Sequence, residues 1–330
     1  MQIVDMHCDT ISEILKHNRL KKECLLRRNS LHVDLERMLL SGYLVQNFAL
    51  FVQMKKCEAT PWDEVCDLYR IYCKELEANA DILAPVYCYA DIEHNHKAGK
   101  MSALLTVEEG GVCGGEIAKL ESLYEMGVRM LTLSWNYPNE LGWPNINLLE
   151  PVDLYSAQTV NGLTDKGREF VVRMEELGMI VDVSHLSDKG FYDVCECTAK
   201  PFVASHSNAR DVCAASRNLT DDMIRKLAAR GGCMGLNFCA DFLERVPDHM
   251  PNPGTVAAIV RHAKHIVNVG GIEVLGLGSD FDGIDTHAEL PGAECMGVLW
   301  EAMHRAGFTQ GQLDAVFKGN VLRVYRDNLS

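Results

Sequence analysis

The chain has 330 residues, of which 47% are hydrophobic, and it carries a formal net charge of −14. This length suits one large domain with a sizeable core. The excess of carboxylates argues against a nucleic-acid partner and an anionic membrane surface, because both need a basic face. No apolar stretch reaches the roughly 18 residues that span a bilayer, and no signal peptide is visible. The 13 cysteines include no CxxC pair, so we expect reduced thiols and a cytoplasmic protein.

Short β-rich runs alternate with helical patterns along the whole chain. The predicted strands cover residues 2–7, 43–52, 102–108, 128–134, 179–184, 202–206, 233–238 and 274–280. The predicted helices lie near 31–41, 62–79, 116–126, 164–177, 188–198, 220–230, 254–269 and 294–306. The stretch 220–231 is typical, because Thr220 can cap the helix start and Gly231 suits the left-handed position after its end.

Eight strand–helix repeats predict a parallel sheet that closes into a (β/α)8 barrel. The connections from helix to strand are short, whereas those from strand to helix are mostly long: 10–30, 135–163, 239–253 and 281–293. Long loops are usually functional, and in this fold they gather on the face that holds the active site. We find no linker or repeat and expect a single domain over residues 1–330. The basic residues of the loop 10–30 are expected to form a solvated face.

The first predicted strand ends in the sequence "DMHCDT". Alternate side chains of a strand point the same way, so Asp5, His7 and Asp9 would share one face. A carboxylate and an imidazole side by side at a strand end make either a metal site or an ion pair.

Other predicted strands also end in polar residues. Each histidine among them, taken alone, is more often structural than a ligand, but together at one end of a barrel they favour a metal centre. Zinc takes three protein ligands in a catalytic site, and two zinc ions about 3.5–4 Å apart would use this larger set. Strand alternation does not decide between Glu108 and Glu109. The strand-end residues are His7, Asp9, Glu108, Glu109, His185, His206, Asp280 and Asp282.

These motifs carry a resemblance to a known family. "DMHCDT", "VEEGG", "GVRMLTLSWN", "DVSHLS", "ASHSNARDVCAASRN" and "GLGSDFDG" resemble the renal or membrane dipeptidases, zinc metallopeptidases on an amidohydrolase-like barrel. "GNVLRVY" is similar to the family's last helix, so the resemblance spans residues 3 to 325. It implies a bacterial-type, cytoplasmic member.

The resemblance also implies a role for each site residue. His7 and Asp9 would bind one zinc ion, Glu108 would bridge both ions, and His185 and His206 would bind the second.

Two further residues follow from the same resemblance. Asp280 matches the position of a general acid/base near the metals, and Arg217 matches the substrate-binding arginine. The chain departs from the mammalian members at Trp135, which replaces a substrate-contacting histidine. Tryptophan offers only an indole N–H donor. We therefore expect Trp135 to form a wall of the substrate pocket, and the loop 136–162 after it to act as a lid.

The resulting prediction is a dinuclear zinc dipeptidase with two Zn²⁺ per chain, acting on small dipeptides and tolerating a D-residue at the C-terminal position. Asp280 would pass a proton to the leaving amine. A homodimer is one option for the assembly. The alternatives are deacylation of N-acyl amino acids, opening of a lactam or lactone, or metal-dependent binding without turnover.

Five residues outside this set complete the expectations. Asp5, and Asp182 in the same way, would accept from a metal-bound histidine. An ion pair of Asp5 with Arg129 is an equal alternative. His262, with His265, is expected on the outer surface.

Overall fold

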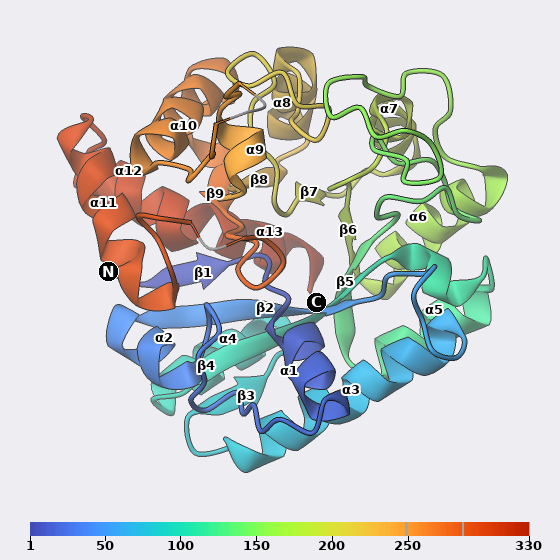
Figure 1. Cartoon of the computed structure of the whole chain (residues 1–330), viewed down its shortest axis with the longest axis horizontal. Helices are drawn as coiled ribbons and strands as arrows, with labels where there is room; N and C mark the ends of the chain where they lie inside the picture. The colour runs from blue at the N-terminus through green and yellow to red at the C-terminus, as the bar shows by residue number, and fades with distance from the viewer. Residues whose placement is uncertain (248–249, 286, 330) are drawn as a thin grey trace.

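The computed structural model describes residues 1–247, 250–285 and 287–329. The strands in this part form one parallel sheet in the order β2-β1-β9-β8-β7-β6-β5-β4-β3, and β2 also pairs with β4. Because β2 pairs with both β1 and β4, eight strands close into a barrel, and helices surround it (Figure 1). The predicted (β/α)8 fold is confirmed.

All eight predicted strands are present, although most are shorter than expected. The structure adds one strand that was not predicted, β3. It has three residues, too few for a visible alternation, and it pairs only with the first residues of β4. The strands are β1 (Ile3–Asp5), β2 (Tyr43–Phe51), β3 (Leu83–Pro85), β4 (Met101–Glu108), β5 (Val128–Thr132), β6 (Ile180–Asp182), β7 (Val203–Ala204), β8 (Cys233–Leu236) and β9 (Leu275–Leu277).

Every predicted helix is present, with its ends shifted by a few residues. None of the helices in the described ranges is long and apolar enough to cross a bilayer. The helices are α1 (Thr10–Arg19), α2 (Leu35–Ser41), α3 (Pro61–Ala78), α4 (Tyr89–Lys97), α5 (Ile117–Glu125), α6 (Asp165–Leu177), α7 (Asp188–Cys197), α8 (Asp221–Ala229), α9 (Ala240–Leu243), α10 (Val256–Gly270), α11 (Met296–Arg305), α12 (Gln310–Asp314) and α13 (Asn320–Asn328).

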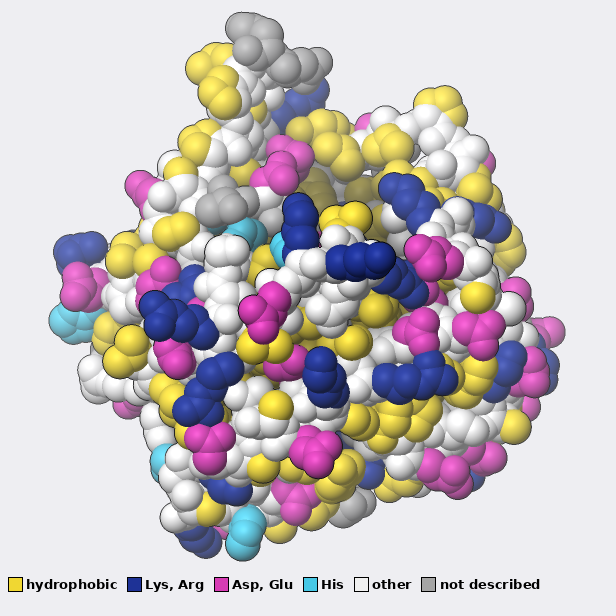
Figure 2. Space-filling view, turned by 60° about the horizontal axis from the view of Figure 1, so that its bottom comes forward, with side chains coloured by type: hydrophobic (Ala, Val, Ile, Leu, Met, Phe, Trp, Pro, Cys, Tyr) yellow, Lys and Arg dark blue, Asp and Glu magenta, His cyan; other side chains and the backbone are white. Residues whose placement is uncertain are grey.

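Helix α1 corrects the expectation that residues 10–30 form a loop. It begins directly after Asp9 and buries Ile11, Ile14 and Leu15, which follow the helical spacing i, i+3, i+4. The polar residues on its other face obscured this short stripe. Four basic residues of this segment, Lys16, Arg19, Arg27 and Arg28, pair with acidic ones, as Arg19 does with Glu64 at 2.7 Å. On the face drawn in Figure 2, Lys and Arg side chains are interspersed with Asp and Glu.

Helix α13 closes the end of the barrel where the strands begin. Its Val321, Val324 and Tyr325 join an apolar cluster with the first residues of several strands. Asn320 donates to the carbonyl of Leu275, the first residue of β9, and Asn328 donates to that of Pro201, just before β7. The opposite end, where the strands finish, is therefore left for the long loops and the site.

Candidate metal centre

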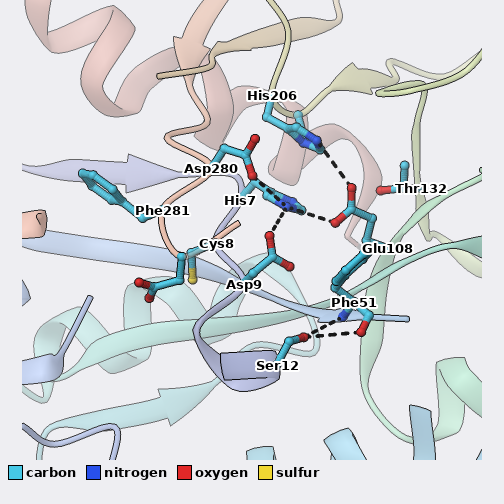
Figure 3. A network of polar contacts seen from close by, with 12 residues as sticks. His7, Cys8, Asp9, Ser12, Phe51, Glu108, Thr132, His206, Asp280 and Phe281 are labelled. Atoms are coloured by element: carbon cyan, nitrogen blue, oxygen red, sulfur yellow. Dashed lines mark hydrogen bonds and ion pairs between the residues drawn. The ribbon is translucent and has the colours of Figure 1, made fainter. Parts of the chain in front are cut away.

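Residues that finish or directly follow five different strands meet at one point of the barrel rim. All are less than 9% exposed, and Figure 3 shows that most of their side chains converge on Glu108 and His7. They meet because the carboxyl ends of parallel strands open on the same rim. The structure thus brings together every predicted metal ligand and Asp280: His7 and Asp9 after β1, Glu108 at the end of β4, His185 after β6, His206 after β7, and Asp280 after β9.

Glu108 lies at the centre of this set. Its Oε2 is 3.3 Å from His7 Nε2, and its Oε1 is 2.9 Å from His185 Nε2 and 3.5 Å from His206 Nε2. Asp9 Oδ2 lies 3.3 Å from the same His7 nitrogen. The two oxygens of Glu108 therefore face two separate groups of donors, His7 with Asp9 and His185 with His206.

The neighbours of His206 determine which of its ring nitrogens carries the proton. The Ser205 hydroxyl lies 2.6 Å from Asp182 Oδ2 and 2.8 Å from His206 Nδ1. A hydroxyl has one proton, and Ser205 donates it in a hydrogen bond to the Asp182 carboxylate. Ser205 Oγ can therefore only accept from His206 Nδ1–H. His206 Nε2 consequently presents a lone pair toward Glu108.

His185 is oriented in the same manner. Its Nδ1 lies 2.9 Å from Asn136 Oδ1, which can only accept. The Nε2 atoms of His185 and His206, both with lone pairs, are only 3.0 Å apart. Two facing lone pairs repel each other unless they share a cation, so this half of the site fits a divalent ion.

The other half of the site contains unsatisfied buried atoms. Within the described ranges, neither ring nitrogen of His7 has hydrogen-bond geometry to a partner, although its Nε2 lies 3.3 Å from both Asp9 and Glu108, and Asp9 Oδ1 has no hydrogen-bond partner. Buried polar atoms are nearly always paired, so an unpaired imidazole beside two carboxylates fits a second cation position. The donor chemistry, with three imidazoles, suits zinc better than magnesium or calcium.

Burial and charge shift the pKa of several of these groups. Burial lowers the pKa of His185 to about 4 and that of His206 to about 3, so both are neutral, as metal ligands must be. Burial also acts to lower the pKa of His7, but Glu108 and Asp9 outweigh it and raise this pKa well above its usual value. Burial, with Asp9 and Glu108, raises the pKa of Asp280 to about 7, against the opposite effect of His7.

Asp280 is held by a tight turn after β9. Its φ is 63°, Asn237 Nδ2 donates to its Oδ2 at 2.9 Å, and its Oδ1 lies 3.8 Å from His7 Nε2. A Cβ at Gly283 would lie 2.1 Å from Asp9 Oδ2 and 2.5 Å from Asp280 Oδ1. The glycine of "SDFDG" therefore lets this turn approach both carboxylates.

Glu109 turns away from the histidines. Its φ is 102°, and its carboxylate accepts from Gly111 N, Asn139 Nδ2 and Trp135 N. Strand alternation left Glu108 and Glu109 open, and the structure places Glu108 among the donors.

A pocket of about 520 Å³ opens above the donor set. Phe51, Trp135 and Phe242 form its aromatic wall, and Asp9, Glu108, His185 and Asp280 line its floor. The half-buried Trp135 ring lies 4.9 Å from the Phe51 ring and 6.2 Å from the His185 ring, measured between centroids.

Arg217 lies behind this wall and is 3% exposed. Its guanidinium lies 5.5 Å from the centroid of the Phe242 ring. It donates only to His206 O at 3.3 Å and Ser207 Oγ at 3.5 Å, and its Nε has no partner. Among the described residues no carboxylate forms an ion pair with it, so a buried guanidinium beside the predicted metal ligand His206 is left with weak contacts.

The family model of the membrane dipeptidases, peptidase family M19, matches residues 1–329. The chain belongs to this family. As a member it is a metal-dependent dipeptidase, and the resemblance drawn from its motifs is confirmed.

Individual relatives agree with this M19 membership. An uncharacterized dipeptidase of Schizosaccharomyces pombe is 30% identical over 352 residues, covering 98% of this chain and 80% of the relative. Dipeptidase 3 of Rattus norvegicus is 32% identical over 228 residues, covering 69% of this chain but 45% of the relative. A solved dipeptidase of family M19 has 25% identity and a TM-score of 0.88, with coverage of 100% of this chain and 99% of that one. A Rhodobacter sphaeroides metallopeptidase, solved with a phosphinate mimic of L-Ala-D-Ala, has 24% identity and a TM-score of 0.87, with 99% of each chain covered.

Two expectations about the surroundings of the M19 site are wrong. Asp5 accepts from the backbone N and the hydroxyl of Ser279, at 2.9 and 2.6 Å, because β9 lies beside β1. With His7, Asp5 shares a hydrogen bond to the backbone N and none to the ring. Arg129 donates to three backbone carbonyls instead of pairing with Asp5. Asp182 reaches His206 through Ser205 rather than directly.

His262 is also misplaced by the sequence pattern. It is fully buried, not on the outer surface, because α9 and the segment after β7 pack against it on α10. Its Nε2 donates to Leu243 O at 2.9 Å and its Nδ1 accepts from Ala209 N at 3.1 Å. His265 is half-buried, 2.7 Å from Asp221 Oδ1.

Proposed function

We propose that this M19 chain is a dinuclear zinc dipeptidase, built as a single domain over residues 1–330, that hydrolyses dipeptides with a free C-terminal carboxylate. The observation that carries the proposal is the position of Glu108, whose two oxygens face two different pairs of donors. One carboxylate between two donor groups is the arrangement that two-metal hydrolases use.

His7 and Asp9 would hold one ion, His185 and His206 the other, and Glu108 both. Zinc ions bound there would polarise the peptide carbonyl and lower the pKa of water toward neutrality. The chain's own contribution is to keep the imidazoles in the ligating tautomer. Ser205 fixes His206 and Asn136 fixes His185.

Asp280 is the proposed general acid/base. It lines the pocket floor and is held by Asn237, which fixes its orientation next to His7. From this place it can take a proton from the attacking water and return it to the leaving amine.

Arg217 is the proposed anchor of the substrate carboxylate. Its planar fork matches a carboxylate with two parallel hydrogen bonds, and its present contacts leave this capacity largely unused. Trp135 and Phe51 would contact a substrate side chain across the pocket. We include tolerance of a C-terminal D-residue in the proposal, and the ligand of the Rhodobacter sphaeroides structure makes L-Ala-D-Ala the first such substrate to test.

The test combines metal analysis with a substrate panel. We expect about two zinc equivalents per chain after exhaustive dialysis. The panel contains L-Ala-L-Ala, L-Ala-D-Ala, their C-terminal amides and N-acetyl-alanine. Wild type should strongly prefer the free acids, Arg217→Lys should weaken this preference, and Arg217→Leu should nearly abolish it with metal content unchanged.

Each part of the proposal has its own contrary result. A single equivalent of metal would refute the dinuclear centre. Equal cleavage of acid and amide by the wild type would remove Arg217 as the anchor. Faster cleavage of N-acetyl-alanine than of any dipeptide would favour the deacylase alternative.

A further inference from the structure

The backbone carbonyls of the two residues that flank Arg217 both accept from one other side chain, Arg210. Its Nη2 donates to the carbonyl of Ser216 at 2.8 Å and its Nε donates to the carbonyl of Asn218 at 2.8 Å. Among the described residues, the guanidinium of Arg217 itself makes two hydrogen bonds, both long, at 3.3 and 3.5 Å, and it packs on the Phe242 ring. The backbone around Arg217, rather than its own side-chain contacts, therefore sets where its guanidinium lies.

Arg210 is in turn fixed by an ion pair with Asp188, the first residue of α7. The pair is bidentate, with N–O distances of 2.6 and 2.7 Å, and the side chains are 15% and 10% exposed. Such a two-point pair fixes the plane of the guanidinium as well as its distance. A lysine at this position could not hold both carbonyls and the carboxylate in the same plane.

The lid loop joins this arrangement through Asn145. Its Nδ2 donates to Asp188 Oδ1 at 3.0 Å and to Ser216 O at 2.9 Å, while its Oδ1 accepts from Gln158 N at 2.9 Å. Ser216 N donates to Leu154 O, also in the lid, at 2.7 Å. Lid residues thus contact the same peptide unit, just before Arg217, that Arg210 holds.

We propose that Arg210, with Asp188 and Asn145, is a positioning device that sets the Arg217 guanidinium for the substrate carboxylate and couples it to the lid. This inference rests on the proposed role of Arg217 as the anchor. Arg210 touches no substrate, and its effect passes through the Ser216 and Asn218 carbonyls. We call Arg210, Asp188 and Asn145 the clamp. A displacement near 1 Å at an anchor such as Arg217 can cost about 10²-fold in rate, so loosening the clamp should have a measurable effect.

The experiment compares three clamp variants, Arg210→Lys, Asp188→Asn and Asn145→Ala, with a matched control. Arg230→Lys is the control, because Arg230 is also half-buried and also donates to two backbone carbonyls, those of Cys195 and Thr198. For each purified metal-loaded variant we would measure kcat and KM on L-Ala-D-Ala and its C-terminal amide, metal content and the melting temperature.

We expect the clamp variants to raise KM for the acid by about tenfold, with the amide kinetics and the metal content unchanged. The acid-over-amide preference should fall in these three variants and stay at the wild-type value in Arg230→Lys. In an Arg217→Leu background, Arg210→Lys should change the preference no further. A role confined to stability would lower the melting temperature and leave the preference intact.

The outcomes separate this inference from the function on which it rests. If wild type shows no preference, or Arg217→Leu keeps it, the anchor is wrong. If Arg217→Leu abolishes the preference while the folded clamp variants keep it, only the positioning role is wrong. Should Arg210→Lys fail to fold, Asn145→Ala, which removes a neutral side chain from the same carbonyl, decides the question.

Discussion

At the scale of single residues, hydrogen-bond partners fix the tautomer or the orientation of side chains in the site. Ser205 Oγ accepts a hydrogen bond from His206 Nδ1–H, and Asn136 Oδ1 accepts one from His185 Nδ1–H. The lone pairs of both Nε2 atoms then face Glu108. Glu109, one residue later, has its carboxylate fully occupied by Gly111 N, Asn139 and Trp135 N. Two adjacent glutamates of the same chemistry thus have different places, and they can be tested against each other.

Glu108→Gln should lose activity and weaken both metal positions, because an amide gives up the charge that faces both donor pairs. Glu109→Gln is the matched control, with the same chemical change one residue away, and it should retain its metal. Elemental analysis and titration with a chelator would measure this. Metal loss in Glu109→Gln together with full metal in Glu108→Gln would reverse the assignment.

Asp280→Asn should keep both ions and lose turnover by about 10²–10⁴-fold, the usual contribution of general acid/base catalysis. The amide can preserve the turn after β9 but cannot carry the proton. The measurement is kcat on L-Ala-D-Ala with metal content determined on the same sample. A variant within a few-fold of wild type would exclude Asp280 from the proton transfer.

At the scale of elements, the backbone turns sharply where the strands end, and these turns direct the site side chains toward one another. In the described part of the chain, four of the five non-glycine residues with positive φ follow strand ends in or beside the site: Glu109, His185, Asp280 and Asp282. A left-handed residue reverses the direction of the chain and redirects the next side chains, at a cost that folds tolerate mainly at functional sites. Long loops follow these strand ends, among them the predicted lid 136–162. They can form the pocket because the strands and helices of the barrel provide the stable core.

Trp135 belongs to this scale because it joins the end of the segment after β5 to the lid. Trp135→Ala should change KM and side-chain preference across a dipeptide panel while the metal content stays at the wild-type value, since the ring lines the pocket wall. Trp135→Phe is the conservative control and should retain most of the wild-type preference. Identical kinetic constants for Trp135→Ala and wild type on every dipeptide would place the ring outside the substrate's reach.

At the scale of the whole molecule, stability and function occupy opposite ends of the barrel. α13 closes the end where the strands begin, and the donors and the pocket lie at the other end. His262 connects the segment after β7 and helix α9 to the outer helix α10, through Ala209 N and Leu243 O. Its single ring serves as donor and acceptor at once, so it must stay neutral.

Burial lowers the pKa of His262 to about 4, whereas an unfolded histidine has a value of about 6.5. The folded pKa is depressed, so this stabilisation is fully present above pH 6.5 and is lost as the pH falls toward 4. His262→Gln should lower the free energy of unfolding at pH 7 by about 1–3 kcal/mol, because a buried hydrogen-bond partner is left unsatisfied. The difference from wild type should narrow between pH 6.5 and pH 5.

Denaturant unfolding at both pH values measures this, with the exposed His304→Gln on α11 as the control. The control should match wild type at each pH. A gap between His262→Gln and wild type that stays constant from pH 7 to pH 5 would mean that His262 does not lose its neutral, buried role on acidification.

The sequence by itself determined the order of strands and helices, the barrel they form and the strand ends that carry the donors. These features are local, because the period of apolar residues and the capping and glycine signals lie within a few positions of the element they define. The positions of His7, Asp9, His185, His206 and Asp280 at strand ends follow from the same local pattern. Short elements with weak periodicity were missed: β3, α1, α4, α9 and α12.

Only the tertiary structure decided the contacts between residues distant in sequence. It placed Glu108 rather than Glu109 among the histidines, and it buried His262. It paired Asp5 with the Ser279 hydroxyl. It also positioned Arg210 and Asn145 to hold the backbone beside Arg217. The physical reason is that a side chain's direction beyond a strand end depends on a left-handed backbone residue and on partners from other elements. A helical stripe shows that His262 and His265 share a face, but not which loops pack against that face.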